Sequence, residues 1–121
     1  MSALVLILVS VGLAVFGQLA FKKGMTNVGT IGLGDLLTPK VISVITEPFV
    51  IMGLILYLLA SAFWVVVLSQ EELSFAYPLI GLGYVFTAIL AKLLFNESLT
   101  LVRMLGILMI VAGAYLIILK I

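Results

Sequence analysis

Phe49 to Gln70, FVIMGLILYLLASAFWVVVLSQ, is an apolar stretch without a single charged residue, and it decides the fold class. A helix rises about 1.5 Å per residue, so a run of this length crosses a hydrocarbon core of roughly 30 Å. Pro48 stands directly before the run, at a position where the first turn of a helix accepts proline. We therefore predict a transmembrane helix over residues 48–70.

Three further apolar runs of similar length flank this one, at residues 3–22, 73–94 and 99–119. Pro78 falls in the first turn of the third run, where proline either starts a helix or bends it. The chain is 65% hydrophobic and 9% charged, whereas a soluble domain is about 25% charged. We predict an all-α membrane protein, with residues 1–121 forming one domain of four transmembrane helices.

The connection between the first two runs is polar and rich in glycine from Gly24 onward, and it extends to Glu47. Its second half becomes weakly amphipathic, through Leu36, Val41 and Ile45 among others. Such a pattern is typical of a helix that lies in the plane of the membrane surface. We expect a loop that contains one short interfacial helix.

The residue types needed for most catalytic and metal chemistry are missing, since the chain contains no histidine and no cysteine. All five acids fall in predicted connections or at span ends, so none lies at mid-membrane: Asp35, Glu47, Glu71, Glu72 and Glu97. A net charge of +1 is too small to favour nucleic acid. We expect no enzyme activity, no metal, no cofactor and no nucleic-acid partner.

The basic residues are distributed unequally between the two sides of a four-span chain. An even number of spans places both termini on one side, and the first and third connections on the other. Five of the six basic residues belong to that second side: Lys22, Lys23, Lys40, Lys92 and Arg103, against Lys120 with the termini. The positive-inside rule then predicts cytoplasmic connections and extracytoplasmic termini, in one fixed orientation.

Small and polar residues recur at helical spacing on three of the predicted spans. The stripe on the first span consists of Ser10, Ala14, Gly17 and Phe21, with Gln18 beside it. The stripe on the second consists of Gly53, Tyr57, Ser61 and Trp64, and that on the third of Tyr77, Gly81, Tyr84 and Ala88. These stripes have two interpretations, because small residues and aromatic tips serve helix packing as well as the lining of a polar cavity. The candidate substrate-binding residues from these spans are Gln18, Tyr57, Ser61, Trp64, Tyr77, Gly81 and Tyr84.

The cations at the span ends also have two interpretations. Lys22, Lys92 and Arg103 either extend to the lipid headgroups, as long basic side chains do, or form an anion-binding vestibule. The start of the fourth helix would add the positive end of its dipole to such a vestibule. Glu97 lies beside that helix start, and we expect it to pair with Arg103 or to stabilise the helix dipole.

Gly106 and Gly113 lie seven residues apart on the fourth span. Glycines at such spacing permit two membrane helices to approach closely. Four helices leave little room for a path inside one subunit. We therefore predict that these glycines form a dimer contact and that the chain is half of an eight-helix dimer.

Two segments carry a family resemblance. Residues 17–25, GQLAFKKGM, resemble the end of the first helix in small members of the drug/metabolite transporter superfamily, the four-helix relatives of EamA proteins. The order AYP at 76–78, FNESL at 95–99 and GILMIVAG at 106–113 is similar to the half-domain of that superfamily. This resemblance covers nearly the whole chain, and it implies a transporter of the bacterial inner membrane.

Two branches of that superfamily have four helices. The small multidrug resistance exporters carry a glutamate in the first helix that exchanges protons for cationic drugs, and alignment on Gly17 and Lys22 places Ala14 at that position. The other branch resembles flippase subunits for aminoarabinose phosphoundecaprenol and related lipid-linked sugars, which share the Gly-Gln, the AYP motif and the longer first connection. This sequence is more similar to the second branch.

The resemblance implies a flippase for a polyprenyl-phosphate-linked sugar, with membrane lipids and that lipid-linked sugar as its binding partners. An exporter of small cationic or metabolite substrates and a non-transporting assembly subunit are the alternatives. Members of this superfamily often form dimers of two oppositely oriented subunits. The single orientation predicted for this chain argues against such pairing between two copies of it. The partner is then a related four-helix subunit of opposite orientation or a parallel second copy, unless the charge rule misleads here.

Overall fold

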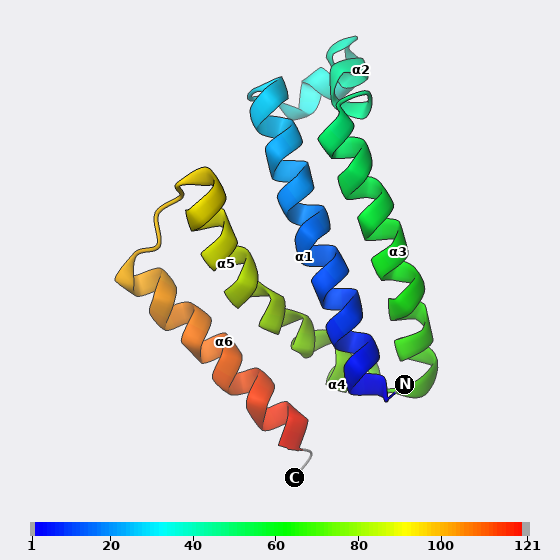
Figure 1. Ribbon diagram of the computed structural model, residues 1–121, viewed down its shortest axis with the longest axis vertical. Coiled ribbons are helices and arrows are strands. Elements are labelled where there is room, and N and C mark those ends of the chain that lie inside the picture. The colour runs from blue at the N-terminus through cyan, green and yellow to red at the C-terminus, as the bar shows by residue number, and fades with distance from the viewer. Residues whose placement is uncertain (1, 120–121) are drawn as a thin grey trace.

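The computed structural model describes residues 2–119 and contains four helical spans that are long and apolar enough to cross a membrane. The elements of these spans are α1 (Ala3–Val28), α3 (Pro48–Gln70), a third span made of α4 (Leu73–Ala76), η2 (Tyr77–Gly81) and α5 (Leu82–Phe95), and α6 (Leu101–Leu119). The prediction of an all-α membrane protein with four spans is confirmed. Figure 1 shows that α1 begins and α6 ends toward the same end of the molecule.

The first helix is longer than its apolar run, because α1 continues through the two lysines to Val28. It ends at Gly29, whose φ of +99° is a conformation that favours glycine. The helix therefore extends beyond the apolar run of residues 3–22, since lysines alone do not end a helix. Two short elements follow in the first connection, η1 (Leu33–Leu37) and α2 (Lys40–Ile45). A position of α2 at the membrane interface stays a prediction.

Close backbone contact joins α1 to α3, which lie side by side in Figure 1. A Cβ atom on Gly53 would lie 2.8 Å from the carbonyl oxygen of Gly17, and one on Gly24 would lie 2.9 Å from the amide nitrogen of Val50. The Ser10 hydroxyl donates a buried hydrogen bond of 2.9 Å to the carbonyl oxygen of Ala60. Small residues therefore bring the two helix backbones together.

The third span is not a continuous α-helix. Its backbone tightens into the 3-10 segment η2, which contains Pro78 near its start. Proline has no backbone N–H, so the α-helical hydrogen bond at this position cannot form. Pro78 therefore lies where the span changes from α-helix to 3-10 helix and not at the start of the span, which begins with α4 at Leu73.

The core lies toward the end of the molecule where α1 begins. Ile7 of α1, Val67 of α3 and Leu79 of η2 are completely buried there. Burial then falls along the chain, because 44% of the most apolar stretch of α1 is buried but only 6% of that of α6. The hairpin of α5 and α6 leans away from α1 and α3 in Figure 1, so most of α6 faces the surroundings.

Candidate functional site

A central cavity of about 430 Å³ lies between α1, α3 and the third span. Its lining includes hydroxyl, amide and indole groups from all three spans: Ser10, Gln18, Tyr57, Ser61, Trp64, Tyr77, Tyr84 and Thr87. Tyr57, Tyr77 and Tyr84 are also exposed at the surface of the subunit, so the cavity is open at its side. A polar cavity with a lateral opening suits a ligand that is partly polar and partly embedded in lipid.

The predicted polar stripes meet in this cavity. Gln18, Tyr57, Ser61, Trp64, Tyr77 and Tyr84 all line it. Gly81 does not line it, because this glycine is buried where a Cβ atom would lie 2.7 Å from a methyl group of Ile110. Gly83 lines the cavity instead, where a Cβ atom would lie 2.9 Å from a methyl group of Val11.

Aromatic contacts hold part of the cavity lining in place. Trp64 and Tyr77 meet edge to face, with ring centroids 6.3 Å apart and planes at 68°. Tyr57 packs against Phe21 of α1, with ring centroids 6.4 Å apart. Such pairs place the apolar rings against each other and leave the polar tips available for hydrogen bonding. The Ser61 hydroxyl donates to the carbonyl oxygen of Tyr57 at 2.9 Å, so its oxygen remains an acceptor toward the cavity.

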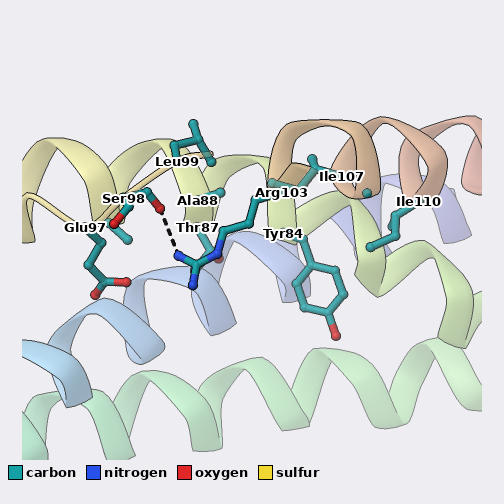
Figure 2. Close-up of a pocket in the computed structure, with 11 residues that line it drawn as sticks. Tyr84, Thr87, Ala88, Glu97, Ser98, Leu99, Arg103, Ile107 and Ile110 are labelled. Atoms are coloured by element: carbon teal, nitrogen blue, oxygen red, sulfur yellow. Dashed lines mark hydrogen bonds between the residues drawn. The ribbon is translucent and has the colours of Figure 1, made fainter. Parts of the chain in front are cut away.

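A second cavity, which we call the hairpin cavity, lies between α5 and α6 and also measures about 430 Å³. Figure 2 shows Glu97, Ser98 and Arg103 toward one end of it, and Ile107 and Ile110 toward the other. Nη1 of Arg103 donates a hydrogen bond of 2.9 Å to the carbonyl oxygen of Ser98. The hairpin cavity therefore has a charged end and an apolar end.

Tyr84 and Thr87 line both cavities, so the central cavity and the hairpin cavity adjoin at these two side chains. Thr87 was not predicted from the sequence. It follows Tyr84 by three residues, a helical spacing that places it on the same face and that would have revealed it. Ser98 was not predicted either. It contacts Arg103 through its backbone carbonyl, and a sequence pattern gives no signal for a backbone contact of this kind.

The structure separates the three predicted cations. Arg103 lines the hairpin cavity, whereas Lys92 is exposed and lines neither cavity. Lys22 forms an ion pair with Glu97, with Nζ and Oε2 3.7 Å apart. Among residues 2–119, Glu97 thus forms its ion pair with Lys22 on α1 and not with Arg103, and the alternative role of stabilising the helix dipole stays a prediction. Arg103 keeps its own contact to Ser98.

The two glycines predicted at a dimer contact have open space beside them. A Cβ atom on Gly106 or Gly113 would meet no other atom within 4 Å. Gly106 also lines the hairpin cavity. A contact of these glycines with another subunit stays a prediction.

Four apolar spans, three of which line a polar cavity that is open at its side, define a small multi-pass membrane protein of the transport class. A protein of Photorhabdus laumondii is 36% identical to this chain over an alignment of 118 positions, and the match covers 91% of each chain. One of Serratia proteamaculans is 34% identical over 112 residues, 89% of this chain and 85% of the relative. One of Yersinia enterocolitica is 36% identical over 111 residues, 89% of this chain and 87% of the relative.

All three relatives are named probable 4-amino-4-deoxy-L-arabinose-phosphoundecaprenol flippase subunit ArnF. The chain therefore belongs to the ArnF family of flippase subunits, and it is a multi-pass protein of the bacterial inner membrane. No protein-family model matches the chain. No solved structure gives a significant match.

Proposed function

We propose that this chain is a transport subunit of a flippase that moves a polyprenyl-phosphate-linked sugar, of the aminoarabinose class named for its relatives, across the inner membrane. The adjoining cavities are the observation that carries this proposal. Their lining extends from Arg103 beside the α5–α6 connection, past Tyr84 and Thr87, to the contact between Trp64 and Tyr77. Polar groups thus line the two cavities along most of the third span.

Such a lining lowers the main free-energy cost of moving a polar headgroup across the membrane. A sugar phosphate that crossed bare lipid would leave its polar groups without hydrogen bonds, at several kcal/mol for each group. Hydroxyl groups of Ser61, Tyr84 and Thr87 offer replacement hydrogen bonds. The polyprenyl tail needs no protein path, because it stays in the hydrocarbon beside the open flank of the cavity.

The proposed orientation places α2 and the α5–α6 connection in the cytoplasm and both termini in the periplasm. The five basic residues near the first and third connections support it through the positive-inside rule. Lys120, the basic residue assigned to the other side, lies outside the described residues. In this orientation Arg103 would meet the phosphate of a substrate that enters from the cytoplasmic leaflet.

A second four-helix subunit completes the path in this proposal. The relatives are named as subunits, and α6 leaves most of its surface uncovered by its own chain. Gly106 and Gly113 would face that second subunit, since they leave space for another helix. A related subunit of opposite orientation and a parallel second copy both satisfy these observations, and cross-linking between the two periplasmic or cytoplasmic ends would distinguish them.

Transport in this proposal consists of binding and release without a covalent step. The described lining of the central cavity contains no acidic or basic side chain. Ala14 lies in that lining, at the position where the resemblance places the proton-exchanging glutamate of multidrug exporters. Export of cations by proton exchange would therefore lack its coupling carboxylate in this cavity.

The test compares native-host membrane vesicles with and without this chain, so that any partner subunit is present. One assay follows a fluorescent short-chain polyprenyl phosphoaminosugar, quenched from outside with dithionite, and a second follows efflux of a quaternary ammonium dye. We expect lipid movement, but not dye efflux, to depend on the chain. Dye efflux alone would support an exporter, and dependence of neither assay would support an assembly subunit.

Neutralising the two cations near the α5–α6 connection tests the vestibule in the same vesicles. We predict that Lys92→Gln with Arg103→Gln slows lipid movement about tenfold, since a hydrogen bond to a charged group contributes about 1.5–3 kcal/mol. Arg103→Gln alone should give most of this loss, because Arg103 lines the hairpin cavity and Lys92 does not. Lys23→Gln is the control for charge alone. An unchanged rate in the folded double variant would assign both cations to the lipid headgroups.

A further inference from the structure

The hairpin cavity carries opposite charges at its polar end. Glu97 and Arg103 both line it, one from the α5–α6 connection and the other from the first turns of α6. The backbone N–H of Arg103 donates to the Thr100 hydroxyl at 3.2 Å, and its guanidinium donates to the carbonyl oxygen of Ser98. The first of these contacts holds the backbone at the start of α6, and the second holds the guanidinium at the tip of the Arg103 side chain.

Neither charged side chain spends all of its binding capacity on a partner within the chain. A guanidinium has five N–H donors, and the Ser98 carbonyl occupies only one of the nitrogens. The Glu97 carboxylate lies 3.7 Å from the Lys22 ammonium, and the two side chains are 42% and 54% exposed. An ion pair of this exposure is weak. Both groups therefore retain capacity to bind a ligand.

The opposite end of the hairpin cavity is apolar. Gly106, Ile107 and Ile110 line it on α6, and the absence of a side chain at Gly106 leaves open space. Tyr84 and Thr87 contribute hydroxyl groups between the two ends. The cavity thus changes along the helices from an anion and a cation, through neutral hydrogen-bonding groups, to hydrocarbon.

We infer that the hairpin cavity binds the headgroup of a lipid that carries both a phosphate and a primary amine. Arg103 binds the phosphate and Glu97 binds the ammonium group, with the first part of the lipid chain along Ile107 and Ile110. This inference rests on the proposed function and deepens it, since it assigns to Glu97 the selection of an amino sugar. A sugar with a hydroxyl in place of the amine can still donate a hydrogen bond to the Glu97 carboxylate, but it carries no positive charge and forms no ion pair with it.

Phosphatidylethanolamine offers the same two groups as a phosphoaminosugar lipid. The experiment therefore uses the complete native-host membrane proteins reconstituted in two kinds of vesicle, one of phosphatidylcholine and phosphatidylglycerol, the other with phosphatidylethanolamine added. The probes are two fluorescent short-chain polyprenyl phosphosugars that differ only in an amine or a hydroxyl on the sugar. The measured quantity is the ratio of their flipping rates, which cancels changes in the amount of folded protein.

We expect Glu97→Gln to lower the ratio of amine to hydroxyl lipid about fivefold, in both kinds of vesicle, because only the amine lipid loses an ion pair. Lys22→Gln is the matched control, because it breaks the same ion pair but keeps the Glu97 carboxylate, and we expect it to leave the ratio unchanged. Arg103→Gln should slow both lipids equally, since both carry the phosphate.

An unchanged ratio for Glu97→Gln, or an equal fall for Lys22→Gln, would overturn the inference while leaving the proposed function intact. A fall that occurs only with phosphatidylethanolamine present would overturn it too, because the site would then hold the host lipid. If the unaltered chain moves neither polyprenyl lipid, the proposed function itself fails.

Discussion

The pair of α1 and α3 and the pair of α5 and α6 are built from similarly apolar helices, yet they pack in different ways. Gly17 and Gly53 face each other across the first pair, where an added Cβ atom would meet backbone. Gly106 and Gly113 in the second pair face open space. Lipid tails are as apolar as leucine, so hydrophobicity alone does not draw membrane helices together. The position of small residues decides which helices touch.

This difference assigns separate roles to the two pairs. The closely packed pair provides a fixed wall, from which Gln18, Tyr57 and Trp64 reach the central cavity. The loosely packed pair encloses the hairpin cavity, with Arg103 at one end. A chain of this size therefore obtains a frame and a binding region from the same kind of helix, by varying where its glycines lie.

The largest expected effect comes from disturbing the α1–α3 contact. We predict that Gly53→Val lowers the free energy of unfolding by about 3 kcal/mol, the upper end of the usual range for overpacking. The reason is that a Cβ atom there would lie 2.8 Å from the carbonyl oxygen of Gly17. Denaturation by SDS in mixed micelles measures this, followed by fluorescence of Trp64, the single tryptophan of the chain.

Gly12→Val is the matched control for that prediction. It introduces the same side chain into α1, where a Cβ atom would meet no other atom within 4 Å. We expect a change close to zero. Equal losses for the two variants would show that the residue type, and not the contact with α3, determines the result.

Local patterns in the sequence were sufficient to predict the spans and the polar stripes. A charge-free run specifies a membrane helix by itself, and helical spacing specifies which residues share a face. The spacing therefore placed Ser61 on one stripe and Tyr84 on another, and the structure brings these side chains and Gln18 to one cavity. Whether they bind substrate stays a prediction.

Features that depend on how the helices meet could not be predicted. The sequence did not distinguish Gly81, which packs against Ile110, from Gly83, which lines the central cavity. Nor did it pair Glu97 with Lys22, which lies 75 positions earlier in the chain (97 − 22). Both outcomes follow from the approach of the third span to α1 and α6, and a local pattern contains no information about that approach.

An intermediate effect is expected from the open side of the second pair. We predict that Gly113→Leu reduces the fraction of dimer about fivefold, which corresponds to a loss of about 1 kcal/mol. The free energy of unfolding of the single subunit should not change, because no other helix of the same subunit lies within 4 Å of the new Cβ position. Cross-linking in native membranes measures the dimer fraction. If Ala112→Leu, on a different face of α6, reduces it equally, Gly113 is not at a specific contact.

The smallest expected effect comes from a single hydrogen bond in the first pair. The buried Ser10 hydroxyl joins α1 to α3 by donating to the carbonyl oxygen of Ala60 at 2.9 Å, whereas the Ser61 hydroxyl donates at the same distance within its own helix. We predict that Ser10→Ala lowers the free energy of unfolding by about 0.6 kcal/mol, the average for interhelical hydrogen bonds in membranes. Ser61→Ala should change it less, because no contact between helices is lost. The same SDS denaturation compares the two variants, and a larger loss for Ser61→Ala would mean that glycine contacts alone hold α1 to α3.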